Sequence, residues 1–368
     1  MKIALLNSYD LGSIRDSWLI EGQDAPSQHL WGYAELASMG HEVEIIPFVK
    51  HRWVKALGKR LKFLGDLDLQ WQILTRSKEF DVVLCGHHLT SALLSLCRRF
   101  HLLKLPVVAI AYQGPRLRSA VWRLHTSLFV TGNDITLCLS ERLLQDFLAL
   151  GVPANRLGLL SWGVELRHYP SAPLVTQPTS VVASQFMLMP GKSFRDYETI
   201  AKAFASIKDC RLVITGFPDL QLDQIHMTNA NIEIVREFVP WRRLIDLYVN
   251  ALAVVIPIST SAGIFNNAIG LTNVTEALAC GKPLLVTRNS YLGIDIEAAG
   301  VGIWIEPNSH EAWTQAVRWL IDHPAESALM GKRAHQLAVS KYNINTYSLT
   351  VEKYLWQARK IDNYTERA

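Results

Sequence analysis

The feature that most constrains this chain is a regular alternation of short, strongly apolar segments with longer amphipathic ones. The apolar segments of the first half are KIALLNSY, HEVEIIPF, FDVVLCG, LPVVAIAY, ITLCLS and LGLLSWGV, and those of the second half are FMLMPG, CRLVITGF, NIEIVREF, AVVIPIS, KPLLVTR and GIWIEP. Strands that alternate with helices form parallel sheets, and continuously apolar strands fit a sheet that helices cover on both faces. The sequence therefore predicts two doubly wound α/β halves.

A break in this alternation predicts the domain boundary. Residues 166–182 carry three prolines and several Ser and Thr residues, which is typical of a linker, and 368 residues suit two domains. We expect one domain over residues 1–170 and a second over 180–344, with a last helix at about 345–368 packing back on the first domain. Further helices are expected at 27–40, 51–65, 196–207, 273–280, 309–322 and 324–340.

Several classes of protein are disfavoured by the same sequence. No apolar run reaches 18 residues, so no transmembrane helix is expected, and MKIALLNSYD predicts a strand rather than a signal peptide. The five cysteines are scattered and form no CxxC pair, which indicates reduced thiols rather than a disulfide framework or a zinc site. These features predict a cytoplasmic location.

Charge is distributed unevenly along the chain. Residues 50–130 hold fourteen Lys and Arg against four Asp and Glu, a net charge of +10, although the whole chain carries only +4. Within this stretch, residues 51–65 predict a helix with Trp53, Leu57, Leu61 and Leu64 on one face and Arg52, Lys55, Lys59 and Lys62 on the other. Such a helix is typical of peripheral binding to an anionic membrane, although an amphipathic helix packed on the sheet is the alternative. No nucleic-acid-binding module is visible, so nucleic acid is not an expected partner.

Two strand-to-helix turns of the second half carry residues suited to a phosphorylated ligand. In MPGKSFRDYETIAKAF (residues 189–204), Gly191 allows a close backbone approach, Ser193 is a candidate helix N-cap, and Lys192 and Arg195 add two cations. In NNAIGLTNVTEALACGKPLLVT (residues 266–287), a helix is expected to begin near Asn273 with Glu276 in its first turn. Its amide groups suit a pyrophosphate and Glu276 suits ribose hydroxyls, whereas a carboxylate that only complements the helix dipole is the alternative.

Together these segments resemble the retaining GT-B glycosyltransferases of family 4, the large "group 1" class. The resemblance runs through ELASMGHEVEIIPF and LSERLLQDFLALGVPANRLGLLSWGVE in the first half, and through GKSFRDYETIAKAF and TNVTEALACGKPLLVT in the second. It implies two Rossmann-like domains facing a central cleft. It also implies transfer of a hexose-type sugar, without a metal or other cofactor, from a nucleoside-diphosphate sugar to a glycan or lipid-linked acceptor.

The resemblance also assigns roles to individual residues. Lys192 and Arg195 match the pair that binds the diphosphate and stabilises the leaving group, with the two residue types exchanged, and Glu276 matches the glutamate that holds the ribose. The other positions implied in donor binding are Gly12, Gly191, Ser193, Phe238, Val239, Gly270, Leu271, Thr272 and Asn273.

The chain departs from the family pattern at two places. Ala268 stands where the first of two glutamates is usual, and the segment after LPVVAIAY has Gln113 where an acceptor-side histidine is usual. His87 is then a candidate catalytic residue, and His88 and Gln113 are candidates for the acceptor side. Two alternatives therefore stay open: a family-like protein that binds a nucleotide or a partner without turnover, and a nucleotide-sugar epimerase of the same fold.

Overall fold

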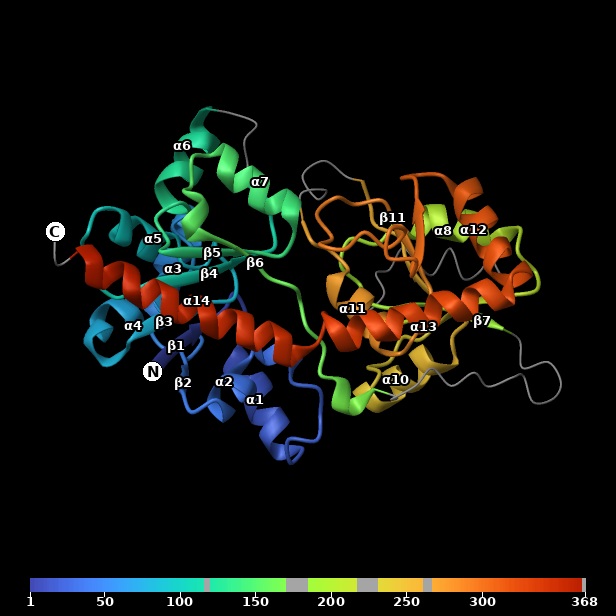
Figure 1. The fold of residues 1–368 in the computed structure, drawn as a ribbon, viewed down its shortest axis with the longest axis horizontal. Coiled ribbons are helices and arrows are strands. Elements are labelled where there is room, and N and C mark those ends of the chain that lie inside the picture. Colours follow the sequence, from blue (N-terminus) through green and yellow to red (C-terminus); the bar gives the residue numbers. More distant parts are fainter. Residues whose placement is uncertain (116–119, 170–184, 217–230, 261–266, 366–368) are drawn as a thin grey trace. The chain divides into compact units, whose positions relative to one another are not determined.

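The chain folds into two compact α/β units (Figure 1). The structure is a computed structural model that describes residues 1–115, 120–169, 185–216, 231–260 and 267–365. Unit 1 comprises Met1–Ser161 together with Ile344–Ala368, and unit 2 comprises Trp162–Asn343. The two parallel, doubly wound units expected from the sequence are confirmed.

Unit 1 contains a six-stranded parallel sheet in the order β2-β1-β3-β4-β5-β6. Its strands are β1 (Lys2–Leu6), β2 (Glu42–Ile45), β3 (Val82–Cys85), β4 (Val107–Ala111), β5 (Ile135–Cys138) and β6 (Leu157–Leu159). Its helices are α1 (Leu11–Ile20), α2 (Tyr33–Ser38), α3 (Arg52–Arg60), α4 (Leu67–Thr75), α5 (Ala92–Arg99), α6 (Ala120–Phe129), α7 (Glu141–Ala149) and α14 (Ile344–Thr365). Short 3-10 turns lie at η1 (Gln28–Leu30), η2 (Lys62–Leu64), η3 (Ser77–Glu79) and η4 (Ala154–Arg156).

Unit 2 contains a second six-stranded parallel sheet in the order β12-β11-β10-β7-β8-β9. Its strands are β7 (Phe186–Met189), β8 (Arg211–Ile214), β9 (Ile232–Ile234), β10 (Val254–Ile256), β11 (Leu284–Thr287) and β12 (Gly302–Ile305). Its helices are α8 (Tyr197–Ala205), α10 (Trp241–Asn250), α11 (Leu271–Ala279), α12 (His310–Asp322) and α13 (Pro324–Ser340), and η5 (Leu166–His168) precedes them.

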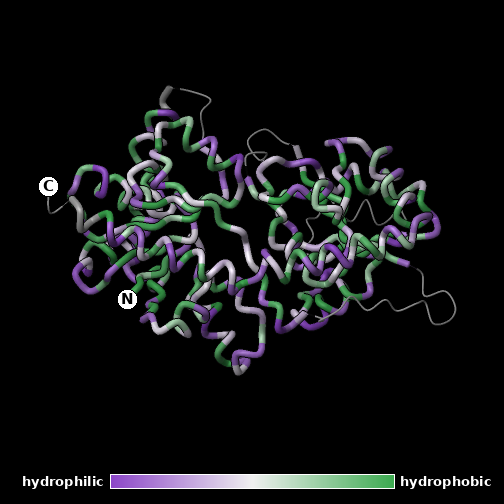
Figure 2. Tube along the Cα trace, viewed as in Figure 1, coloured by the Kyte–Doolittle hydropathy of each residue, from purple (hydrophilic) through white to green (hydrophobic). Residues whose placement is uncertain are grey.

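Every apolar segment predicted as a strand contains one, and the inner strands are almost wholly buried, whereas the outer strands β2, β6, β9 and β12 are partly exposed. All four residues of β3 and all five of β4 are buried, and Figure 2 shows apolar segments, in green, gathered in the middle of unit 1, where its strands lie. Apolar side chains of the flanking helices complete the cores, with Ile73 and Leu94 in unit 1 and Phe204 and Trp313 in unit 2. In unit 1, α14 packs against α2, β3 and β4, although it is the last helix of the chain.

Some predicted boundaries are wrong. The single helix expected over residues 27–40 is broken, because Trp31 and Gly32 adopt left-handed backbone angles between η1 and α2. The predicted linker begins with ordered structure, since η5 occupies its first three residues and Tyr169 is buried. Its remaining residues lie outside the described ranges. Among the helices of those ranges, none has the length and apolar character needed to cross a membrane.

Candidate functional site

The topology of unit 2 places the first candidate segment at a switch in strand order. Strands β8 and β9 extend the sheet on one side of β7, and β10, β11 and β12 extend it on the other. The segment after β7 is fastened to the segment after β10, because the Ser259 amide donates to the Phe194 carbonyl at 2.9 Å and the Asp196 amide donates to the Pro257 carbonyl at 3.0 Å. Ligands of open α/β sheets bind beyond the carboxyl ends of the strands at such a switch.

Gly191 is required by the close packing of this segment. Its backbone has φ +77°, and a Cβ atom there would lie 2.7 Å from Asn273 Oδ1 and 2.9 Å from an Arg195 guanidinium nitrogen. Gly216, which follows β8, packs equally closely, since a Cβ atom there would lie 3.0 Å from the Gly191 carbonyl carbon. The backbone after β7 is therefore held between two neighbouring segments, where a side chain does not fit.

Arg195 is buried rather than presented to solvent. Its side chain donates to the carbonyls of Pro190 (3.0 Å) and Ser193 (2.8 Å) and to Asn273 Oδ1 (2.7 Å), and 7% of the residue is exposed. Burial lowers the pKa of the guanidinium to about 10. Through these hydrogen bonds, the Arg195 guanidinium fixes the backbone of residues 190–195 and links it to α11.

The second candidate segment forms the start of α11. The helix begins at Leu271 with Gly270 as its N-cap at φ +85°, two residues before the predicted start. The Leu271 amide donates to the Ala268 carbonyl at 3.3 Å, whereas in the described structure the amides of Thr272 and Asn273 have no acceptor. Two main-chain donors at the positive end of the helix are thus available to an anion.

The prediction that Glu276 lies in the first turn of α11 is wrong, because the residue lies one turn later. Because the dipole of a helix acts mainly on its first turn, complementing that dipole does not explain a carboxylate here. The residue is 7% exposed, and its Oε2 accepts a hydrogen bond of 2.8 Å from the Tyr248 hydroxyl of α10 and lies 3.5 Å from Asn273 Nδ2. Burial and the neighbouring carboxylate together raise the pKa of Tyr248 well above its ordinary value, so the hydroxyl remains a donor.

These contacts join Arg195, Asn273, Tyr248 and Glu276 into one hydrogen-bonded group, called here the Glu276 cluster. Asn273 is its centre, because its amide oxygen accepts from Arg195 and its amide nitrogen donates to Tyr248 at 3.3 Å. The cluster connects the turn after β7 with α10 and α11 and fixes the orientation of a buried carboxylate.

The remaining predicted residues of unit 2 lie around the cluster or beyond it. Lys192 and Ser193 are exposed, but Ser193 is not a helix N-cap, because Asp196 caps α8 by accepting from the Thr199 amide. Phe238 and Val239 lie between β9 and α10, and 70% of Phe238 is exposed.

In unit 1 the candidate histidines follow β3. His87 stacks on Tyr112 with ring centroids 4.4 Å apart, and burial lowers its pKa to about 4. His88 is fully buried beside Phe147, and burial holds its pKa well below the ordinary value. Both imidazoles are therefore neutral at pH 7, and within the described ranges His87 Nε2 and His88 Nδ1 have no hydrogen-bond partner.

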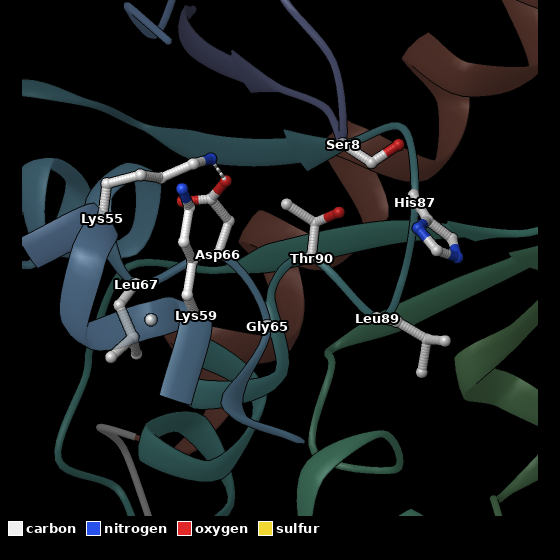
Figure 3. A pocket seen from close by; sticks show the side chains of 10 residues that line it. Ser8, Lys55, Lys59, Gly65, Asp66, Leu67, His87, Leu89 and Thr90 are labelled. Carbon is white, nitrogen blue, oxygen red and sulfur yellow. Dashed lines mark hydrogen bonds and ion pairs between the residues drawn. The ribbon is translucent and has the colours of Figure 1, made fainter. Parts of the chain in front are cut away.

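Each of these histidines lines a different hollow of unit 1. The smaller, of about 290 Å³, has Ser8, His87 and Thr90 on its wall, and Figure 3 shows Lys55 and Lys59 reaching it from α3. The larger, of about 480 Å³, is lined in part by His88 and by Gln113, which follows β4. Gly12 lies elsewhere in unit 1, in the first turn of α1.

The basic segment differs from its predicted form, because the helix over residues 51–65 ends at Arg60 and is followed by η2. Its apolar face is not packed on the sheet: Trp53 is 67% exposed and Leu57 46%, whereas Val54 is buried. Lys55 forms an ion pair with Asp66 and lies over the Phe48 ring, so this lysine is held against the protein. Arg52, Lys59 and Arg60 are exposed.

Comparisons with known proteins find a family profile that matches part of the chain. The family profile described as "Glycosyl transferases group 1" matches residues 186–337, which contain the Glu276 cluster. No curated protein matches the chain.

Solved structures match the fold over nearly the whole length. The Anabaena protein HepE in complex with UDP and glucose is 14% identical, with 96% of this chain and 99% of that chain covered and a TM-score of 0.64. Sucrose-phosphate synthase from Thermosynechococcus elongatus is 15% identical, with 97% of this chain and 98% of that chain covered and a TM-score of 0.70. UDP-GlcNAc 2-epimerase from Neisseria meningitidis is 16% identical, with 97% of this chain and 100% of that chain covered and a TM-score of 0.58. These similarities establish the GT-B fold expected from the sequence.

Proposed function

We propose that the chain is a retaining glycosyltransferase that binds a nucleoside-diphosphate sugar in unit 2 and transfers a hexose-type sugar to a glycan or lipid-linked acceptor. The observation that carries the proposal is the Glu276 cluster, a buried carboxylate beside two unoccupied helix amides at the switch point of the sheet. The family match covers this region. Solved structures of similar fold are named as complexes with UDP or UDP-glucose, so uridine nucleotides are the first ligands to test.

The ribose and the diphosphate of the donor then each have a partner in unit 2. Glu276 accepts hydrogen bonds from the ribose hydroxyls through the carboxylate that Tyr248 holds in place. The diphosphate lies against the amides of Thr272 and Asn273, where the helix dipole and the exposed Lys192 oppose its charge. Arg195 was expected to bind the diphosphate directly. We propose instead that it supports the site by holding residues 190–195 in place.

The reaction breaks the bond between the anomeric carbon and the diphosphate oxygen and forms a bond from that carbon to the acceptor oxygen on the same face. The departing diphosphate oxygen keeps the electron pair of the broken bond, gains negative charge and takes up the proton that the acceptor hydroxyl releases. The groups that face this charge as it develops are the α11 amides and Lys192, which is the arrangement that accelerates such a step. Because these groups supply the positive charge, we expect transfer without a metal ion.

The absence of a carboxylate at Ala268 favours a second candidate, a protein that binds the donor without transferring it. An epimerase of the same fold is also tested by the same experiment. Purified protein is screened with nucleotide sugars by thermal shift, and each stabilising donor is then incubated with and without acceptors. Transfer to an acceptor supports the proposal, stabilisation without any product supports the binder, and an epimeric donor formed without acceptor supports the epimerase.

The exposed face of α3 supports a peripheral membrane location on the cytoplasmic side. Trp53 and Leu57 present apolar surface to solvent beside the exposed cations Arg52, Lys59 and Arg60. An amphipathic segment of this composition binds anionic membranes, with about 1 kcal/mol gained per cation near the surface. The acceptor would then be met at the membrane surface.

A further inference from the structure

The larger hollow of unit 1 is not used by the proposed donor chemistry. It measures about 480 Å³, a size typical of pockets for small organic ligands. Part of its wall is apolar and comes from three separate elements: Phe63 from η2, Leu89 from the segment after β3, and Val130 from the end of α6. An apolar wall of this kind favours hydrocarbon over a sugar, whose hydroxyls would lose hydrogen bonds to water there.

The polar side chains that line this pocket are those of Arg60, His88, Gln113, His125 and Thr126. Arg60 lines it from the end of α3 and is exposed, and it forms no ion pair within the described ranges. His88 is buried and, since burial lowers its pKa, remains neutral. The pocket therefore combines apolar walls with a guanidinium group, which binds phosphate oxygens in a forked geometry.

The smaller hollow lies next to this pocket and has charged and hydroxyl side chains on its wall, including those of Lys59, Ser8 and Thr90. The two hollows share Leu89, and the neighbours Lys59 and Arg60 line one hollow each. The smaller one presents Ser8 and His87, which follow β1 and β3 at the switch point of the unit 1 sheet (Figure 3). A ligand that extends through both hollows would place its polar end beside Ser8 and His87 and its apolar end beside Phe63 and Val130.

Building on the proposed glycosyltransferase function, we infer that the acceptor is an amphiphile whose hydrocarbon chain enters the pocket of Phe63, Leu89 and Val130 and whose adjoining phosphate pairs with Arg60. The exposed Trp53 and Leu57 of α3 belong to the same helix as Arg60, so the pocket and the proposed membrane-binding face are adjacent in the chain. An acceptor drawn from a membrane would need to pass only from that face to this pocket.

The chemistry can be tested with monoalkyl phosphates, titrated calorimetrically into the full chain below their micelle-forming concentrations. Along the series butyl, hexyl and octyl phosphate, the Kd should fall about fourfold for each methylene group that becomes buried. Inorganic phosphate should bind far more weakly than octyl phosphate. A Kd that does not depend on chain length, or equally tight binding of inorganic phosphate, overturns the inference.

Matched variants locate the binding. Arg60→Ala should weaken octyl phosphate about tenfold, whereas Arg52→Ala, which removes an exposed cation at the other end of α3, should leave it unchanged. Phe63→Ala should flatten the dependence on chain length, whereas Leu124→Ala, an exposed leucine of α6, should not. Equal effects of each variant and its control would show non-specific binding and would overturn the inference.

A titration with UDP and other nucleoside diphosphates on the same samples separates this inference from the proposed function. Nucleotide binding combined with a flat alkyl series refutes the amphiphile alone and indicates a free glycan acceptor. If alkyl phosphates bind with an affinity that depends on chain length but no nucleotide binds, the glycosyltransferase function is refuted, and the pocket of Phe63, Leu89 and Val130 is still a site for an amphiphile. Transfer to an acceptor glycan at equal kcat/KM with and without its lipid also contradicts the inference.

Discussion

Replacing Tyr248 with Phe removes one hydroxyl from the centre of the proposed donor site. The hydroxyl donates to Glu276 Oε2 at 2.8 Å, and both residues are buried. Asn273 Nδ2, at 3.5 Å, is too distant to replace it fully. A hydrogen bond to a charged group contributes about 1.5–3 kcal/mol, and Tyr248→Phe removes such a bond from a buried carboxylate oxygen. We expect the free energy of unfolding to fall by about 2 kcal/mol.

This loss should be measurable in two ways. For a unit of the size of Trp162–Asn343, a loss of about 2 kcal/mol lowers the Tm by about 4–8 °C in scanning calorimetry. Nucleotide binding should weaken about fivefold, because about 1 kcal/mol is then needed to fix the carboxylate that Tyr248 orients in the wild-type protein. Isothermal titration with the best-binding nucleoside diphosphate measures this effect.

A second tyrosine in the same unit provides the control. The Tyr342 hydroxyl donates to the Gly293 carbonyl at 3.1 Å and is also buried, but it lies in a different part of unit 2 from the Glu276 cluster. Tyr342→Phe should cost about 1 kcal/mol of stability and leave nucleotide affinity unchanged. If Tyr248→Phe lowers stability but leaves nucleotide affinity at the wild-type value, the orientation of Glu276 by Tyr248 has no part in binding and the reasoning is refuted.

Further perturbations test other parts of the account. Gly191→Ala should lower the unfolding free energy by about 1–3 kcal/mol in urea titrations, because its φ of +77° and its close contacts leave no room for a methyl group; wild-type stability would contradict this. Lys192→Ala should lower kcat about 10- to 100-fold while Lys202→Ala, on the exposed face of α8, does not; an equal kcat for both would remove Lys192 from the mechanism. Burial lowers the pKa of His87 to about 4 in the folded protein, so the unfolded chain takes up a proton first and the free energy of unfolding falls as the pH decreases from about 6.5 to 4. His87→Gln should make the free energy of unfolding depend less on pH in this range. An unchanged pH dependence would show that the imidazole is not buried in its neutral form. Trp53→Ala should reduce co-sedimentation with phosphatidylglycerol vesicles but not alter nucleotide affinity, and undiminished sedimentation would argue against the α3 face as the membrane contact.

The inner strands were predictable from the sequence because burial on both faces leaves a simple apolar pattern, as in β3, β4 and β5. Helix boundaries were less predictable, since single residues decide them. The left-handed pair Trp31–Gly32 breaks a segment whose periodicity favours one helix, and α11 begins at a glycine cap rather than at Asn273, which is the commoner type of capping residue. Asp196, rather than Ser193, caps α8 because its carboxylate reaches the Thr199 amide.

The candidate site was predictable only in part. The spacing of Gly191, Arg195, Asn273 and Glu276 within two turns marked these residues in the sequence, and the structure brings them together. Tyr248 gave no such signal, because its hydrogen bond to Glu276 joins residues 28 positions apart on different helices. The pocket of Phe63, Leu89 and Val130 likewise depends on the packing of three elements that no local pattern connects.

The most direct test of the central claim is a crystal structure of the chain with a bound nucleoside diphosphate. We expect the ribose hydroxyls to lie within about 2.5–3.0 Å of the Glu276 carboxylate and the diphosphate oxygens to accept from the amides of Thr272 and Asn273. A nucleotide bound elsewhere, with the Glu276 carboxylate and these amides making no contact to it, would contradict the proposed donor site.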